Sequence, residues 1–470
     1  MSTPVQVIDA VRNAFPAIVK NTDYIHSENA GGSQVLGSVA AKISSYLLES
    51  NVQMADYKLA YAAKAQVDAG YAATALYLGH DVTSEEVMFG SSATQLVETL
   101  SRMIEESIIQ RNIWVKGDEI VISEADHETN RGAWKRLAAR HGLVIKHWTT
   151  SDISVNSPSP SNNVSKELHT NKLAEVVTER TRLVCFTACS NVLGSFVEIP
   201  AAVKVVKEKS GGKAWTCVDA VAYAPHRRPK PKDLGVDFLF WSWYKVYGPH
   251  LGTMYLTLRA QEELLTRLNH HFLHSYPGTY PFQPSSQQYE LIASVAAIGN
   301  YFAALGNTVK SDAQDRTVST LASAPEIDWV GALRSADHSK DLSQLLDAAY
   351  DWIASHENEI TKTFLRTLRQ PEEKSGFHIV GDAEDNPRKR APTIAFVADG
   401  KHNSQTAKQI HSLLVDSAKM GAQQGHMYAY DLIKALGLDL EDGVVRVSFV
   451  HYNTIEEAQK VGETLTSAPL

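Results

Sequence analysis

Between residues 30 and 260 of this 470-residue chain, short apolar segments alternate with segments of helical periodicity. Strands that are buried on both faces read as continuous apolar runs, and a crossover helix joins each to its parallel neighbour. The alternation therefore predicts an α/β fold with a mostly parallel sheet. The expected strands are 86–89, 119–123, 143–148, 182–187, 215–218 and 238–241, and the expected helices are 94–105, 131–141 and 201–209.

A second α/β pattern follows the long helical stretches 289–304 and 341–369 and the charged segment 372–390. Two strands and two helices predict a smaller C-terminal α/β domain. We expect an N-terminal segment, 1–29, that packs on the small domain, a large domain, 30–300, and a small domain, 301–470. The expected elements of the small domain are the strands 393–397 and 444–450 and the helices 404–417 and 429–436.

Composition excludes several classes of protein. The chain has 45 Lys+Arg against 53 Asp+Glu and a net charge of −8, which argues against a nucleic-acid partner. The N-terminus lacks the pattern of a secretory signal, and no apolar run approaches the ~18 residues of a membrane span. We therefore expect a cytoplasmic protein without a membrane partner. GxGxxG, GxxxxGK[ST], HExxH and GxSxG are all missing from the sequence.

The chain has three cysteines, which are too few for a disulfide framework and lack the spacing of a zinc ribbon. His270, His271 and His274 could form a local metal tract. A polar helix end explains them better, because no carboxylate cluster accompanies them. We expect no metal.

Asp219 and Lys245 stand just past two expected strands, 215–218 and 238–241. Ligands of open α/β sheets bind beyond the carboxyl ends of the strands, so both residues would face one crevice. Such a pair suits pyridoxal 5′-phosphate (PLP), whose aldehyde reacts with a lysine and whose ring nitrogen is held protonated by an acid. The spacing alone does not choose between this site and a turn-capping Asp with a surface Lys.

Two more features favour PLP. Phe89 to Gln95 reads as a strand, a small-residue turn and a helix start, which could bind a phosphate but also resembles an ordinary serine cap. His127 follows the strand 119–123 and could stack on a pyridine ring, although a loop histidine is more often only exposed.

Together these residues resemble the aminotransferase class V, or cysteine desulfurase-like, group of fold-type-I PLP enzymes. The resemblance covers nearly the whole chain. It implies a homodimer with shared active sites, a seven-stranded, mostly parallel sheet in the large domain and a smaller C-terminal α/β domain. The matching segments are 28–32, 89–95, 122–134, 187–194, 218–219, 242–249 and 445–454.

The resemblance also implies roles for individual residues. Lys245 would form the Schiff base, Asp219 would pair with the pyridinium nitrogen, and His127 would stack on the ring. From the expected mechanism, and apart from the resemblance, we predict that Lys245 also shuttles protons, assisted by Tyr244 or Tyr428. The remaining expected residues are Asn191 at the phenolic oxygen, Ala93, Thr94 and Ser242 at the phosphate, Ser286 at the phosphate of the partner subunit, and Arg446, Asn29 and Tyr428 at the substrate.

Three departures from the family pattern are informative. Ala222 stands where the family usually has Gln, and Tyr244 where it usually has His. Cysteine desulfurases carry sulfur on a mobile cysteine in the C-terminal half, but the last cysteine here is Cys217 and the matching loop, 421–429, has none. A persulfide relay is therefore not expected.

The segments 240–253 and 446–454 look closest to a branch of fungal specialised metabolism. That branch includes the ustiloxin-pathway decarboxylative aldolase and the loline-pathway PLP enzyme. It implies decarboxylation of an amino acid to a carbanion or enamine that attacks an aldehyde or iminium, in alkaloid or peptide natural product biosynthesis. If the α-carboxylate leaves, Arg446 must hold another acid group.

Three alternatives stay open. One is a C–S lyase that works without a persulfide cysteine, and another is a transaminase or epimerase. The third is a protein of PLP-enzyme fold that has lost catalysis, against which the presence of Asp219, Lys245 and Arg446 argues.

Overall fold

The structure is a computed structural model that describes residues 4–153, 164–284, 286–311, 321–369, 376–400 and 403–467, with side chains from Val7 onward. It divides into two compact units, each built from three segments of the chain. The first unit comprises 1–20, 34–115 and 227–352, and the second comprises 21–33, 116–226 and 353–470. The domain boundaries expected from the sequence stay a prediction.

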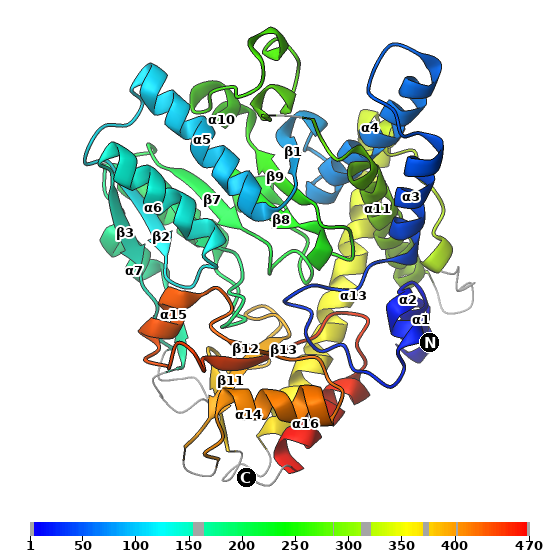
Figure 1. Cartoon of the computed structure of the whole chain (residues 1–470), viewed down its shortest axis with the longest axis vertical. Coiled ribbons are helices and arrows are strands. Elements are labelled where there is room, and N and C mark those ends of the chain that lie inside the picture. Colours follow the sequence, from blue (N-terminus) through cyan, green and yellow to red (C-terminus); the bar gives the residue numbers. More distant parts are fainter. Residues whose placement is uncertain are drawn as a thin grey trace. The chain divides into compact units, whose positions relative to one another are not determined.

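Seven strands belong to one large mixed sheet, as expected (Figure 1). The first unit contributes three in the order β1-β9-β8, with antiparallel neighbours. The second unit contributes four in the order β7-β6-β2-β3, all parallel. The strands are β1 (Val87–Gly90), β9 (Gly252–Leu256) and β8 (Phe238–Ser242), then β7 (Trp215–Asp219), β6 (Thr181–Thr187), β2 (Glu119–Ser123) and β3 (Val144–Trp148).

Helices cover these strands and explain their apolar character. In the first unit, α5 (Ala93–Arg111) packs on β1, β8 and β9. In the second unit, α6 (Thr129–His141), α7 (Thr170–Val176) and α8 (Ile199–Ser210) pack on β2, β3 and β6. Every residue of β2 and β7 is buried, whereas the edge strand β3 is partly exposed. The continuous apolar runs of the sequence are thus strands with both faces covered.

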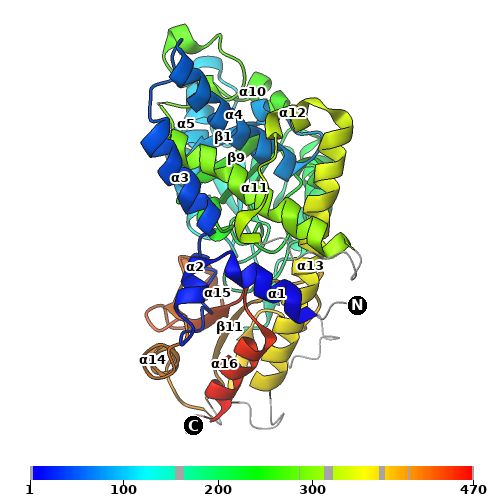
Figure 2. The ribbon, with the colours of Figure 1, turned by 90° about the vertical axis from the view of Figure 1, so that its right-hand side faces the viewer.

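The first unit also has a helical layer (Figure 2). Its centre is α11 (Tyr289–Lys310), which packs against α3 (Gly37–Glu49) and α4 (Lys58–Leu78). Among the described residues, α11 is the one helix long and apolar enough to cross a membrane, and 83% of its apolar stretch is buried inside the protein. The other helices of this unit are α1 (Pro4–Asn13), α2 (Pro16–Lys20), α9 (Pro231–Leu234), α10 (Leu258–Glu263) and α12 (Trp329–Arg334).

The second unit contains an antiparallel sheet in the order β10-β11-β13-β12. Apolar side chains from it, from α13 and from the C-terminal helix form one core cluster. The long helix α13 (Ala336–Leu368) supplies residues to both units. The remaining elements are β10 (Phe377–Val380), β11 (Thr393–Ala398), β12 (Gln423–Gly425), β13 (Val444–Ser448), α14 (Ala407–Ser412), α15 (Tyr430–Ala435), α16 (Ile455–Ser467) and the hairpin β4 (Ser151–Asp152) with β5 (Lys166–Glu167).

Candidate active site

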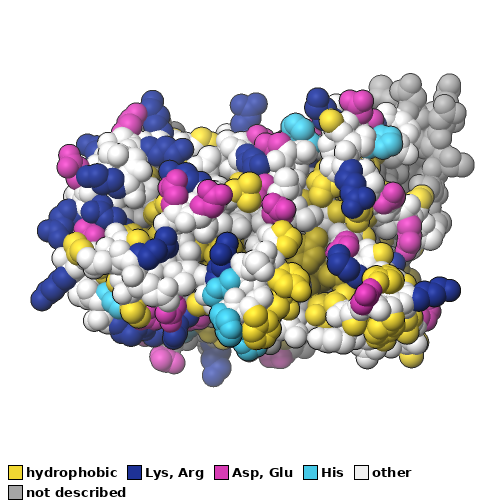
Figure 3. Space-filling model, turned by 90° about the horizontal axis from the view of Figure 1, so that it is seen from above, with side chains coloured by type: hydrophobic (Ala, Val, Ile, Leu, Met, Phe, Trp, Pro, Cys, Tyr) yellow, Lys and Arg dark blue, Asp and Glu magenta, His cyan; other side chains and the backbone are white. Residues whose placement is uncertain are grey.

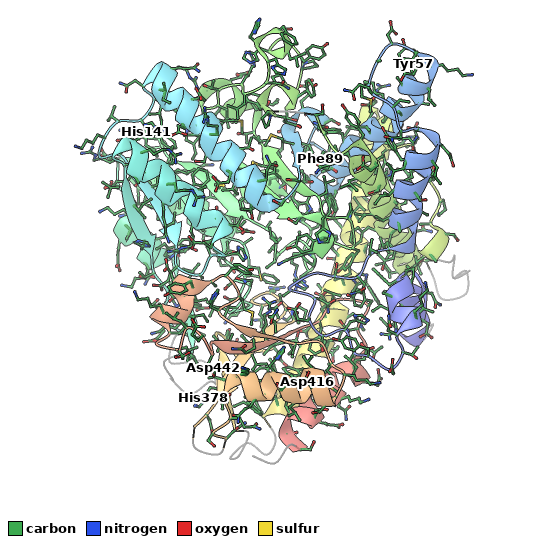
Figure 4. The ribbon with its side chains drawn as sticks, viewed as in Figure 1. Tyr57, Phe89, His141, His378, Asp416 and Asp442 are labelled. Carbon is green, nitrogen blue, oxygen red and sulfur yellow. The ribbon has the colours of Figure 1, made fainter. Side chains whose placement is uncertain are left out.

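A turn of small residues joins β1 to α5 in the first unit, just after Phe89, which is labelled in Figure 4. The hydroxyl of Ser92 caps the helix by accepting the N–H of Gln95 at 3.1 Å. The N–H of Ala93 donates to Oγ of Ser242, the last residue of β8, at 3.4 Å. The structure therefore brings together two predicted phosphate residues, Ala93 and Ser242, and Thr94 lies exposed beside them.

Gly252, the first residue of β9, lies against the backbone of this turn. A Cβ at Gly252 would lie 2.5 Å from the backbone carbon of Ser92 and 2.8 Å from the nitrogen of Ala93. Only glycine allows the strand to approach the turn so closely. The result is a rigid helix N-terminus with a serine hydroxyl beside it, which is a suitable site for a phosphate.

Lys245 ends the single 3₁₀ turn Trp243–Lys245 that follows β8. Its side chain is buried, with 8% of the residue exposed. The turn is held by backbone bonds from Trp243 to Leu251 at 2.8 Å and from Gly248 to Trp243 at 2.9 Å. A buried lysine on a fixed turn is suited to covalent chemistry, because its amine can react with an aldehyde.

Tyr244 stands beside this lysine. The Lys245 ammonium lies 5.9 Å from the centre of the Tyr244 ring. The imidazole of His250 stacks on that ring at 5.1 Å with an interplanar angle of 13°. The aromatic group that replaces the family's histidine is thus held in place by a second histidine.

Ser286 is exposed and lines a cavity of about 280 Å³ in the first unit. Ser91 and Gln95 of the β1–α5 turn line the same cavity. Ser286 therefore lies near the phosphate turn of its own chain, and its reach to a partner subunit stays a prediction.

Asp219 ends β7 in the second unit and is 4% exposed. Its Oδ1 accepts the N–H of Val221 at 2.8 Å, which fixes the carboxylate at the end of the strand. Asp126 was not predicted as a site residue, although it directly precedes His127. Burial raises the pKa of Asp126 to about 7, and the negative charge of Asp219 adds to this shift.

His127 is half-buried, and its Nδ1 accepts the N–H of Thr129 at 3.1 Å. This bond leaves the ring proton on Nε2 in the neutral imidazole. The centres of the His127 and Tyr428 rings are 5.2 Å apart, and the rings are inclined at 33°. The backbone oxygen of Tyr428 accepts the N–H of Glu128 at 2.8 Å. The structure therefore brings together two predicted site residues, His127 and Tyr428.

Arg446 lies on β13 and is 4% exposed. One of its terminal nitrogens donates to the backbone oxygen of Asn191 at 3.1 Å, and the other forms an ion pair with Glu28. The amide of Asn191 in turn donates to the backbone oxygen of Met427 at 2.8 Å. Oδ1 of Asn191 and Nε of Arg446 are buried without a partner among the described residues. Buried polar atoms of this kind point to a ligand.

Asn29 is buried and joins the N-terminal segment to the strand that carries Arg446. Its amide donates to the oxygen of Ser448 at 2.8 Å and to Oδ1 of Asn453 at 3.2 Å, and its own Oδ1 accepts the hydroxyl of Tyr452. This bonding fixes the position of Glu28, which the sequence had not identified as a site residue. A direct role of Asn29 in substrate binding stays a prediction.

The three cysteines are free and buried. Burial raises the pKa of the Cys185 thiol well above its usual value. The loop 421–429 has no thiol, and its residue Tyr428 covers His127 instead.

The histidine tract 270–274 is not arranged as a metal site. Within the described ranges, no group of three or more His, Cys, Asp or Glu could hold a metal ion. His270 stacks on Phe272 at 5.4 Å, and Nε2 of His274 bonds the backbone oxygen of Asn269 at 2.7 Å. Figure 3 shows histidines gathered beside hydrophobic side chains on one face of the molecule.

The residues fit the cofactor that the resemblance implies. The first unit, taken by itself, contains a buried lysine and phosphate donors. The second unit, taken by itself, contains a buried acid, an imidazole and a guanidinium group. These groups match the aldehyde, the phosphate, the ring nitrogen and the ring face of PLP, and the carboxylate of an amino acid.

Comparisons with known proteins agree with the family that the sequence resembles. The Aminotransferase class-V family model matches residues 25–324 and 339–461. The aminotransferase-like protein FGM3 of Gibberella zeae is 32% identical over 467 residues, which cover 98% of each chain. The cysteine desulfurase-like protein ustD of Aspergillus flavus is 26% identical and covers 96% of this chain and 88% of its own. The apo cysteine desulfurase from Thermococcus onnurineus NA1 shares the fold, with a TM-score of 0.72, 19% identity, and coverage of 100% of this chain and 99% of its own.

Proposed function

The chain belongs to the aminotransferase class V family of PLP-dependent enzymes, and from that premise we propose that it decarboxylates an amino acid and forms a C–C bond. The carbon nucleophile left by CO2 attacks an aldehyde or iminium carbon. The observation that carries this proposal is the loop 421–429, where a desulfurase has its acceptor cysteine. Here the loop has no thiol and places Tyr428 beside His127. The resemblance of segments 240–253 and 446–454 to enzymes of fungal specialised metabolism supports the same chemistry.

The two residue sets would bind one cofactor. In this proposal Lys245 would bind the aldehyde of the cofactor, Asp219 would pair with its ring nitrogen, and His127 would stack on its ring. The N–H groups of Ala93 and Thr94 and the hydroxyl of Ser242 bind the phosphate. Asn191 donates to the phenolic oxygen, for which its amide would exchange its present bond to Met427.

PLP supplies an electron sink for the pair of electrons released when a bond to the substrate's α-carbon breaks. The side chains of the protein determine which of these bonds is cleaved and which atoms accept or donate protons. Asp219 would stabilise charge in the ring, because it is a buried carboxylate held by the Val221 N–H. In this proposal Nζ of Lys245 would give and take protons, and the hydroxyl of Tyr428, whose ring lies 5.2 Å from that of His127, would assist it.

Arg446 would hold a carboxylate, for which its planar guanidinium group is suited. A carboxylate paired tightly with Arg446 is stabilised as an anion and does not leave easily. The leaving carboxylate and the one bound by Arg446 are therefore different groups in this proposal, and the substrate is an amino acid with two carboxylates.

The decisive experiment incubates the purified holoenzyme with dicarboxylic and sulfur-containing amino acids, with and without an aldehyde acceptor. Released CO2 and sulfide are measured, and products are identified by mass spectrometry. We expect CO2 and a new C–C adduct that appear together and require Lys245. Lys245→Ala should abolish both, whereas Lys204→Ala, at an exposed ion pair on α8, should change neither.

Sulfide without CO2 would contradict the proposal and identify a C–S lyase. A keto acid formed without CO2 would contradict it in favour of a transaminase.

A further inference from the structure

We propose that Glu28 is a specificity-determining residue that occupies the carboxylate position on Arg446 until a substrate carboxylate displaces it. This inference rests on the proposed role of Arg446 as a carboxylate clamp. It concerns which acids can bind, whereas the proposed function concerns which bond breaks.

The ion pair between Glu28 and Arg446 supports this inference. A terminal nitrogen of Arg446 contacts Oε1 of Glu28, and the side chains are 4% and 22% exposed for Arg446 and Glu28, respectively. The arginine is thus fixed in the sheet, while its acidic partner lies nearer to solvent. The carboxylate of Glu28 thus already pairs with Arg446, the residue to which the family resemblance assigns the binding of the substrate carboxylate.

The backbone around Glu28 is shaped to hold this carboxylate. A Cβ at Gly31 would lie 2.1 Å from Oε2 and 3.0 Å from Oε1 of Glu28. Because Gly31 has no side chain, the carboxylate of Glu28 can fold back over its own turn. Ala30, which directly precedes Gly31, donates its N–H to Oγ of Ser448 at 2.7 Å, which anchors the turn beside β13.

The pairing leaves the guanidinium group incompletely satisfied. One terminal nitrogen bonds Asn191, the other bonds Glu28, and the buried Nε has no partner within the described ranges. A ligand carboxylate that binds in the bidentate manner satisfies two parallel N–H groups, which a single ion pair does not. A substrate carboxylate that binds Arg446 in this manner therefore displaces the carboxylate of Glu28. An acid that binds Arg446 weakly or in a poor geometry does not displace it and is excluded.

The test measures binding of succinate, a dicarboxylate without an amino group, to the holoenzyme by isothermal titration calorimetry. Glu28→Gln keeps a hydrogen-bond acceptor and removes the competing charge, so we expect it to bind succinate at least tenfold more tightly than the wild type. Gly31→Ala, which pushes the Glu28 carboxylate out of its place, should shift affinity in the same direction. Arg446→Gln should abolish binding, and Asp23→Asn, at an exposed ion pair in the same segment, should have no effect.

Equal or weaker succinate binding by Glu28→Gln would overturn the inference, as would the absence of binding by every variant. The measurement needs no turnover. Failure of the decarboxylation proposal would leave the competition between succinate and Glu28 visible, and failure of the competition would leave CO2 release unchanged.

Discussion

Asp126 is a buried carboxyl group beside the site, and its pKa predicts how stability depends on pH. The pKa lies near 7 in the folded protein, mainly because of burial, and near 4 in an unfolded chain. Between about pH 4 and pH 7, the carboxyl group of Asp126 is therefore protonated in the folded protein and ionised in the unfolded chain. Stability from this group is therefore full below about pH 4 and is lost as the pH rises towards 7, by up to ~1.4 kcal/mol per pH unit.

Asp126→Asn removes this titration. Its stability relative to the wild type should increase between pH 4.5 and pH 8, as measured by urea unfolding at both values. A difference that stays constant or decreases with pH would contradict the assignment.

Gly252 predicts a second effect at the residue scale. Gly252→Ala forces a methyl group against the backbone of the Ser92–Ala93 turn, so we expect a loss of ~1–3 kcal/mol in unfolding free energy and weaker PLP binding. Gly132→Ala is a suitable control, because the nearest atom there is the flexible end of Arg136 at 3.1 Å. Spectroscopic PLP titration and denaturation of both variants check this; equal effects would contradict it.

Residues differ in how far the sequence reveals them. Lys245 and Asp219 could be identified because each follows an apolar strand, and strand ends are where ligands bind. Glu28 could not be identified in this way, because its partner Arg446 is 418 residues away and only folding brings them together. Asp126 was missed for a similar reason, since its pKa depends on burial and on Asp219.

Helix caps allow a prediction at the scale of elements. Ser92 caps α5 at the candidate phosphate turn. Thr406 caps α14, whose first two N–H groups also donate to the carboxylate of Asp442, which is labelled in Figure 4. Removing either cap should cost ~1 kcal/mol of stability. Only Ser92→Ala should also weaken PLP binding, since only α5 begins at the site. A matching loss of PLP affinity in Thr406→Ala would contradict the assignment of the turn.

The elements themselves were largely predictable. The expected strands correspond to β1, β2, β3, β6, β7, β8, β11 and β13, because buried strands leave continuous apolar runs. The strand β9 was missed, since it begins at Gly252 soon after Gly248-Pro249, where the sequence indicates a turn. The expected helix 404–417 ends in a wide π-helical turn, Leu413–Ser417, which periodicity does not reveal.

At the scale of the whole molecule, the order of strands and helices and the family resemblance led to the same fold. The domain boundaries and the cytoplasmic location are still predictions. So is the homodimer, for which the sequence argument is the expected reach of Ser286 to a partner's phosphate.

The homodimer predicts a mass of two chains in analytical ultracentrifugation of the holoenzyme. It also predicts weaker PLP binding in Ser286→Ala, because the cofactor would lose a hydroxyl contact from the other subunit. A fully active monomer would contradict both the assembly and the role of Ser286.

The central claim is that Lys245 carries PLP in this protein, and chemical trapping tests it most directly. The holoenzyme is treated with borohydride, which reduces the bond between lysine and cofactor to a stable one, and is then digested and analysed by mass spectrometry. We predict a phosphopyridoxyl group on the peptide that contains Lys245, and its absence from Lys245→Ala. A modified peptide from elsewhere in the chain, or none at all, would contradict the claim.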